Sequence, residues 1–214
     1  MTLVTGGGRR RIGLLGGTFD PPHIGHLRVA VAVRHALDLD EVLLVPNGDP
    51  WQKRDARDLT PAALRLEMVD AATEALTPTA RVAVSDVEVR RPGPSYTADT
   101  VSQLQGAEPG LEVIVVLGRD AAELLPTWER LDEVLDRAVV AVVDRPGAAA
   151  GPLSGVDPSR VVAVEVEQLA VSSSGVRDLV AEGAPIDVLV PPGVAAVIAR
   201  EGLYRGRGGR HVAG

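Results

Sequence analysis

The chain has 214 residues, a formal net charge of −7 and no cysteine. Its length is near the usual ~100–200 residues per domain, so we predict one domain over residues 1–214, and 45% hydrophobic residues suffice for a core. The acidic balance argues against partners such as nucleic acid or an anionic membrane. The missing thiols exclude disulfides, thiolate metal sites and cysteine nucleophiles. No signal-peptide-like or membrane-spanning apolar run is found, so we expect a cytoplasmic protein.

Short runs of aliphatic and β-branched residues alternate with helix-like stretches along the chain. Most of the runs are near-continuously apolar, which is typical of parallel strands buried on both faces. The alternation predicts an α/β fold, with a doubly wound, mostly parallel sheet between two layers of helices. The six predicted strands are Arg11–Leu15, Glu41–Pro46, Arg81–Val89, Glu112–Leu117, Ala138–Asp144 and Val161–Val166.

Two helices have clear boundary signals. Thr60 and Pro61 predict an N-cap followed by the first helical residue, and apolar positions then recur at helical spacing from Leu64. A second helix is predicted to open at Pro191 and to stop near Gly202. Elsewhere, the Gly-, Pro- and Ala-rich stretch 147–158 predicts a mobile excursion, and we expect frayed ends at residues 1–9 and 205–214.

A glycine turn follows the first predicted strand, in the sequence GGTFDPPHIGHL at residues 16–27. Two glycines at the carboxyl end of a strand let the backbone approach a phosphate, and the next helix offers free N–H groups and a positive dipole end. The turn has neither the Gly-Lys-Ser/Thr of a P-loop nor a G-x-G-x-x-G pattern. It therefore predicts a phosphate site without supporting P-loop hydrolysis or dinucleotide redox chemistry.

His23 and His26 lie three residues apart in this turn, so both imidazoles are expected on one face of the first turn of the helix, where phosphates would lie. Two of the chain's four histidines fall here, which favours a functional role. One alternative is that they cap the helix through local hydrogen bonds. Another is a metal site made of Asp20, His23 and His26.

Ser172, Ser173 and Ser174 are expected at a strand-to-helix junction, with Arg177 one turn into the helix. Hydroxyls at an N-cap and a guanidinium that can bind phosphate oxygens form a second anion cradle. The alternative is a plain N-cap with a solvated arginine.

Lys53 is the one lysine among 22 basic residues, and it lies in the loop after the second predicted strand. A compact ammonium on a flexible stem suits a migrating phosphate charge, so Lys53 is a candidate catalytic residue. A single lysine can also be accidental.

Five segments together resemble a known family. The turn at residues 16–27 resembles the signature of nucleotidyltransferases with an H-x-G-H motif. Four later segments narrow the resemblance to bacterial nicotinate-mononucleotide adenylyltransferases: Pro94–Thr100, Gly118–Trp128, Val171–Arg177 and Glu201–Arg205. They occur in the family's order and span nearly the whole chain.

The resemblance implies a Rossmann-like nucleotidyltransferase fold and a role in NAD biosynthesis. The implied reaction joins ATP to nicotinate mononucleotide, yields nicotinate adenine dinucleotide and pyrophosphate, and uses Mg²⁺ with ATP. The implied catalytic residues are His23, His26, Lys53 and Arg177. The implied ATP-binding residues are Gly16, Gly17, Thr18, Phe19, His23, Gly25, His26, Ser172, Ser174 and Arg177.

The implied mononucleotide-binding residues are Asn47, Tyr96, Thr97, Asp120 and Trp128. The helix that begins at Tyr96 and Thr97 offers N–H groups to the nicotinate carboxylate, and Trp128 offers a flat face to a pyridinium ring. Packing against leucines is the alternative for Trp128, and a helix N-cap is the alternative for Asp120.

Three other functions remain open at this point. The chain resembles related enzymes such as phosphopantetheine adenylyltransferase in its first turn and Ser-rich segment. A metal-dependent hydrolase could use Asp20, His23 and His26, and a regulator could bind a nucleotide without chemistry. The sequence also leaves a homo-oligomer open.

Overall fold

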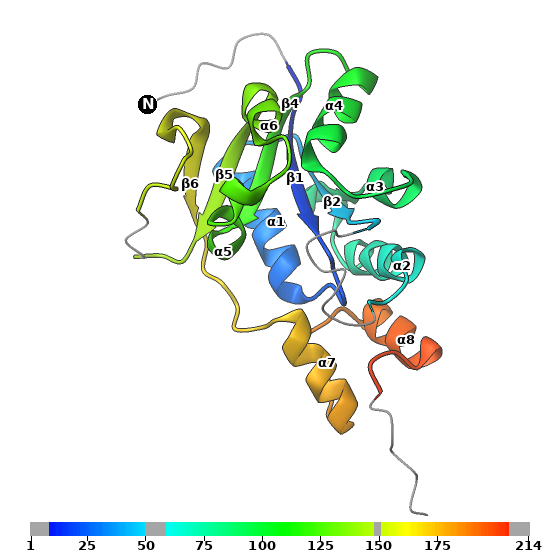
Figure 1. Cartoon of the computed structure of the whole chain (residues 1–214). Coiled ribbons are helices and arrows are strands. Elements are labelled where there is room, and N and C mark those ends of the chain that lie inside the picture. The colour runs from blue at the N-terminus through cyan, green and yellow to red at the C-terminus, as the bar shows by residue number, and fades with distance from the viewer. Residues whose placement is uncertain (1–8, 50–58, 148–150, 206–214) are drawn as a thin grey trace, which may run out of the picture.

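The computed structural model describes residues 9–49, 59–147 and 151–205. A six-stranded sheet has the order β3-β2-β1-β4-β5-β6, and every neighbouring pair is parallel (Figure 1). This is the doubly wound order, so the predicted α/β architecture is confirmed. The strands are β1 (Arg11–Gly17), β2 (Glu41–Pro46), β3 (Val82–Val84), β4 (Glu112–Gly118), β5 (Ala138–Asp144) and β6 (Val161–Glu165).

Helices connect the strands and cover both faces of the sheet (Figure 1). The longer ones are α1 (Ile24–Ala36), α2 (Ala62–Thr73), α4 (Thr97–Ala107), α6 (Leu131–Arg137), α7 (Ser173–Glu182) and α8 (Pro192–Glu201). The single-turn ones are α3 (Val87–Arg90) and α5 (Arg119–Ala122), with 3₁₀ turns η2 (Pro78–Ala80), η3 (Leu125–Thr127) and η4 (Pro158–Arg160).

Two hydrophobic clusters form the core, one on each face of the sheet. Successive side chains of a strand point to opposite faces, so Leu14 and Leu15 of β1 fall in different clusters, as do Ile114 and Val115 of β4. The first cluster, which contains Leu15, includes buried residues of α1, α2, α7 and α8. The second cluster, which contains Leu14, includes buried residues of α4, α5 and α6. The three-layer prediction is therefore confirmed.

One predicted strand is wrong in its second half. The apolar run Arg81–Val89 forms a strand only as far as Val84, and α3 follows from Val87. The helical turn carries Val87 into contact with the second cluster and buries the carboxyl group of Glu88. The hydrogen bonds that Glu88 accepts from Asn47 and Thr100 thus compete with the local preference of valines for extended backbone.

The predicted end of the last helix is confirmed, whereas the predicted N-cap of α2 is wrong by one residue. Pro61 is the N-cap of α2 and Ala62 its first residue, so Thr60 does not cap the helix as predicted. The Thr60 hydroxyl lies 3.4 Å from the hydroxyl of Tyr204 instead. The last helix ends as predicted at Gly202, whose φ of +62° is the left-handed conformation in which glycine lacks a Cβ penalty.

The stretch 147–158, predicted from its composition to be a mobile excursion, is described only in part. In its described part, Leu153 and Val156 are buried in the second cluster. The predicted frayed ends fall almost entirely outside the described residues, and the single-domain prediction stays a prediction. No helix in the described ranges has the length and apolarity to cross a membrane.

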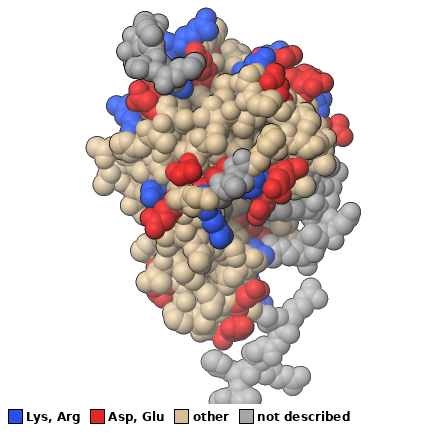
Figure 2. Space-filling view, turned by 90° about the vertical axis from the view of Figure 1, so that its left-hand side faces the viewer, with Lys and Arg blue, Asp and Glu red and all other residues tan. Residues whose placement is uncertain are grey.

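The surface carries charges of both signs. Figure 2 shows the face on the β6 side, where Lys and Arg are interspersed with Asp and Glu between broad uncharged areas. The described residues of this face show no continuous basic field of the kind that a nucleic-acid footprint requires.

Candidate active site

A cavity of about 370 Å³ lies at the carboxyl ends of β1 and β4. The strand order reverses between these two strands, which is where doubly wound sheets bind ligands. All five predicted mononucleotide-binding residues line this cavity, together with three residues of the glycine turn. The lining includes Gly16, Gly17, Thr18, Asn47, Glu88, Ser95, Tyr96, Thr97, Asp120, Trp128 and Glu129.

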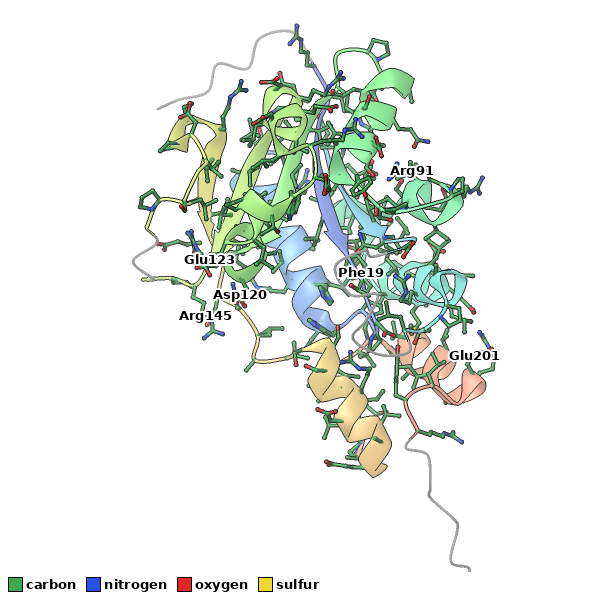
Figure 3. All side chains as sticks on the ribbon, viewed as in Figure 1. Phe19, Arg91, Asp120, Glu123, Arg145 and Glu201 are labelled. Carbon is green, nitrogen blue, oxygen red and sulfur yellow. The ribbon has the colours of Figure 1, made fainter. Side chains whose placement is uncertain are left out.

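The glycine turn is supported from below by Phe19. Its ring is 2% exposed and packs edge-on to the His26 ring, with 4.9 Å between ring centroids. A Cβ at Gly17 would lie 3.1 Å from the Phe19 ring, so the close approach of ring and backbone favours glycine there. Phe19 therefore supports the turn with its buried side chain, and its predicted ATP-binding role stays a prediction. Figure 3 labels Phe19 beside the first turn of α1.

His23 and His26 lie together, as their spacing predicts, although His23 is the N-cap of α1 and not part of its first turn. Their rings stack with 3.7 Å between centroids and 23° between planes. His26 Nδ1 accepts a hydrogen bond of 3.1 Å from the His23 backbone N–H, so local capping is part of its role. His23 Nδ1 is buried and has no hydrogen-bond partner among the described residues.

Burial lowers the pKa of His23 to about 4. Desolvation disfavours the charged imidazolium, so His23 is neutral at neutral pH in the absence of a nucleotide. A neutral imidazole donates a hydrogen bond through one nitrogen, and the negative charge of bound phosphates would favour its protonation.

This shift predicts how stability depends on pH. The His23 pKa is depressed in the folded state, so the unfolded chain takes up the proton first as pH falls below about 6.5. The free energy of unfolding therefore has its full value above pH 6.5 as far as His23 is concerned. It falls by up to about 3 kcal/mol towards pH 4, at about 1.4 kcal/mol per pKa unit. Urea unfolding at pH 7, 5 and 4 measures it. His23→Gln should lack this part of the decline, and identical pH profiles of the two proteins would refute the burial argument.

The metal alternative finds no support. Asp20 accepts a hydrogen bond of 2.6 Å from the Tyr204 hydroxyl, and the two imidazoles stack on one another. No group of three or more His, Asp or Glu side chains in the described residues could hold a metal ion. The arrangement of Asp20, His23 and His26 therefore does not support the metal-dependent hydrolase hypothesis.

Gly25 lets the first turn of α1 approach the segment before α7. A Cβ at this position would lie 2.9 Å from His23 Nδ1 and 3.0 Å from Val171 Cγ1. Any larger residue would push one of these groups away. The absence of a side chain at Gly25 thus lets the glycine turn pack against the Ser-rich segment, the two segments that the sequence predicts to bind phosphate.

The Ser-rich segment meets the glycine turn directly. Ser172 is the N-cap of α7 and its hydroxyl accepts the Gly175 N–H at 3.1 Å, which confirms the predicted junction. Ser173 donates to the Pro21 carbonyl at 2.8 Å, and Arg177 Nη1 donates to the Asp20 carbonyl at 2.6 Å. Arg177 is therefore not a plain solvated arginine. It is held beside the turn.

Ser172 and Ser174 are exposed, and their hydroxyls lie 3.1 Å apart at the amino end of α7. This arrangement presents two hydroxyls at a helix N-terminus, and Arg177 follows one turn further along the same helix. Such a group of donors can bind phosphate oxygens.

Arg65 was not predicted from the sequence. It is 1% exposed, and its guanidinium donates to the carbonyls of Thr18 at 2.8 Å, Thr60 at 2.9 Å and Gly48 at 3.3 Å. These three carbonyls belong to the glycine turn, the segment before α2 and the loop after β2. Arg65 thus ties three loops together at the edge of the site.

A signal for Arg65 exists in the sequence. Arg65 shares a helical face with Met68, Val69 and Ala72, which are all fully buried. A charged residue on an apolar face is an exception that needs a buried partner. Burial lowers the pKa of Arg65, and the nearby Asp20 opposes that shift.

The helix that faces the mononucleotide side begins as predicted, with Tyr96 as N-cap and Thr97 as the first residue of α4. The Tyr96 carbonyl accepts the amides of Asp99 and Thr100 at 3.1 and 3.3 Å. The amides at the very start of α4 have no intrahelical acceptor by geometry. Tyr96 and Thr97 line the cavity, so a ligand there can accept hydrogen bonds from the first amides of α4.

Trp128 combines both predicted roles, because it is half-buried against the second cluster and also lines the cavity. Asp120 is exposed at the cavity wall, as Figure 3 shows beside α5. Gly118 is the N-cap of α5, so the N-cap alternative for Asp120 is wrong. Lys53 lies outside the described residues.

Glu88 is a second residue that the sequence did not reveal, since it falls within a predicted strand. It is 3% exposed; Oε2 accepts from Asn47 Nδ2 at 3.0 Å, and Oε1 accepts from the Thr100 hydroxyl at 2.7 Å. A carboxylate only accepts, so this contact fixes the orientation of the Asn47 amide. A Cβ at Gly48 would lie 2.2 Å from the Glu88 carbonyl, so the loop fits here only with glycine.

Comparison with known proteins identifies the family of this chain. A family model described as cytidylyltransferase-like matches residues 14–179. A relative from Acidothermus cellulolyticus is 41% identical over 204 residues, which cover 93% of this chain and 96% of the relative. One from Saccharopolyspora erythraea is 42% identical over 200 residues, covering 92% and 91%. Both bear the name "Probable nicotinate-nucleotide adenylyltransferase".

Among solved structures, the fold is similar to that of the Plasmodium falciparum nicotinic acid mononucleotide adenylyltransferase complexed with NaAD. The TM-score is 0.72 at 18% identity, with 92% of this chain and 98% of the other covered. The complex of that enzyme with APC gives a TM-score of 0.70. At 18% identity the structural match supports only the fold. The family assignment rests on the relatives that are 41% and 42% identical. The chain thus belongs to the nicotinate-nucleotide adenylyltransferases, within the cytidylyltransferase-like proteins.

Proposed function

We propose that this protein transfers the adenylyl group of ATP to nicotinate mononucleotide and releases pyrophosphate. One observation carries the proposal beyond family membership. Gly16, Gly17 and Thr18 line the cavity on one side, and the same turn leads to His23 and the Asp20 carbonyl that holds Arg177. A mononucleotide in the cavity and a triphosphate beside α1 and α7 would meet at this turn.

The reaction needs little acid–base chemistry. The attacking phosphate monoester has a second pKa of ~6, so it is largely ionised at pH 7. We assign catalysis to alignment and charge stabilisation. The imidazoles of His23 and His26, the Arg177 guanidinium and the hydroxyls of Ser172 and Ser174 would hold the phosphates and the departing pyrophosphate. No covalent enzyme intermediate is needed.

Mg²⁺ enters as part of the same proposal. This hard cation prefers oxygen ligands and is often bound mainly through substrate phosphates. The described residues offer no ready group of three His, Asp or Glu ligands, which fits a cation carried by ATP. When bound, it would neutralise phosphate charge.

The mononucleotide would occupy the cavity. The start of α4 would receive the nicotinate carboxylate, Trp128 would stack on the pyridinium ring, and Asp120 and Asn47 would hold ribose hydroxyls. All these groups line the same cavity.

Stoichiometric pyrophosphate release tests the proposal. Mixing ATP with nicotinate mononucleotide should release one pyrophosphate per dinucleotide formed, and neither substrate alone should do so. Phosphopantetheine in place of the mononucleotide should give no product. Binding of ATP without pyrophosphate release would favour the regulator, and turnover with phosphopantetheine would favour the related enzyme.

Lys53 provides a separate prediction. Lys53→Arg should impair turnover nearly as much as Lys53→Ala, because a planar guanidinium does not follow a migrating charge as a compact ammonium does. Steady-state kcat of both variants measures this. Wild-type activity in Lys53→Arg would show that any cation suffices.

The oligomeric state and the cytoplasmic location stay predictions.

A further inference from the structure

The segment after α8 returns to the glycine turn and contacts it with one side chain. Leu203 donates its amide to the Ile198 carbonyl at 3.0 Å, and the next residue, Tyr204, has a φ of +62°. Positive φ is uncommon for an aromatic residue, so tertiary contacts must hold this conformation. Tyr204 is half-buried against the first hydrophobic cluster. Its hydroxyl points to Asp20.

The contact between Tyr204 and Asp20 is a strong one. The hydroxyl donates to Asp20 Oδ1 at 2.6 Å, and Asp20 is only 3% exposed. A hydrogen bond to a carboxylate is roughly twice as strong as a neutral one. Burial and the bond to Asp20 raise the pKa of the Tyr204 hydroxyl, so it keeps its proton at any pH where the enzyme would work.

Asp20 connects this contact to the ATP side of the site. While its side chain is held by Tyr204, its backbone carbonyl accepts the guanidinium of Arg177 at 2.6 Å. Arg65 places a further positive charge near the carboxylate. A single residue of the turn is therefore held by the C-terminal segment through one group, and itself holds Arg177 through another.

We propose that Tyr204 is a positioning residue for ATP, which fixes Asp20 and through it the guanidinium of Arg177. This inference rests on the proposed function. Because Asp20 holds Arg177 and Tyr204 does not line the cavity, the effect of Tyr204 is expected on the triphosphate side of the site.

Tyr204→Phe tests the proposal, because it removes one oxygen atom and leaves the packed ring. We expect kcat/KM for ATP to fall about tenfold, as for the loss of a charge-assisted hydrogen bond. The KM for nicotinate mononucleotide should stay within about twofold, since no cavity residue changes. Thr60→Val is the matched control: it removes only the 3.4 Å contact to the same hydroxyl and should behave as wild type.

A double-mutant cycle separates positioning from a general loss of stability. If Tyr204 acts through Arg177, then Tyr204→Phe should change ATP efficiency little in an Arg177→Ala background. Additive effects of the two substitutions would overturn the proposal. So would equal losses for both substrates, or unchanged ATP efficiency in Tyr204→Phe.

Binding measurements keep this test independent of the reaction. Calorimetry with a non-hydrolysable ATP analogue alone should show about tenfold weaker binding to Tyr204→Phe, whether or not the wild type makes the dinucleotide. If the variant does not fold, hydrogen exchange on the unchanged protein decides. The analogue should slow amide exchange at residues 203–205 several-fold while the mononucleotide does not, and unchanged exchange would overturn the proposal.

Discussion

Replacing either histidine of the turn by alanine is expected to lower turnover by about a hundredfold or more. Preorganised donors aimed at developing phosphate charge contribute roughly this much each. His23 is buried, so its ring is held in place before substrate binds, and the stacked His26 ring fixes its orientation. Steady-state kcat of His23→Ala and His26→Ala measures the effect.

The fold should survive both substitutions. His26→Ala removes an acceptor at the start of α1, a capping loss of ~0.5–2 kcal/mol that circular dichroism during thermal unfolding would register as a modest shift. His35→Ala is the matched control, because His35 is an exposed histidine of the same helix, and its turnover should equal that of the wild type. Near-normal turnover in both His23→Ala and His26→Ala would show that the two histidines only cap the helix and play no part in catalysis.

Nicotinate mononucleotide is expected to be used about tenfold to a hundredfold more efficiently than nicotinamide mononucleotide. The substrates differ by a carboxylate against a neutral amide. The start of α4 at the cavity presents backbone donors and a positive dipole end, which add ~0.3–1 kcal/mol for an anion, more when partly buried. An amide would turn its own N–H₂ towards these donors and leave buried groups unpaired, at ~1–3 kcal/mol. The ratio of the two kcat/KM values measures the preference.

A pair of variants at Thr97 locates the source of this preference. Thr97→Pro removes the first amide of α4 at a position where helices accept proline, and the extended backbone of Tyr96 suits a following proline. It should lower the preference for nicotinate about tenfold, while Thr97→Ala keeps the amide and should retain the preference. Equal use of both mononucleotides by the wild type would show that the carboxylate is not recognised here.

The architecture and the turns that carry the predicted phosphate donors can be read from local patterns in the sequence. Strands buried on both faces need continuous apolar runs, and a parallel sheet needs helices between strands, so both features show in the local pattern. The stop of α8 at Gly202, the N-cap at Ser172 and the start of α4 at Thr97 also follow from local rules of helix ends.

The contacts that hold these turns in place are visible only in the folded chain. Arg177 donates to a carbonyl 157 residues earlier in the chain, and Tyr204 bonds a carboxylate 184 residues earlier. Backbone carbonyls carry no sequence signature, so a bond to one of them is invisible before the chain folds. Glu88 and Arg65 are buried charged residues whose hydrogen-bond partners the sequence alone does not identify, although the apolar helical face around Arg65 signals that it is buried. Their burial became favourable because folding brought hydrogen-bond partners from other loops to meet them.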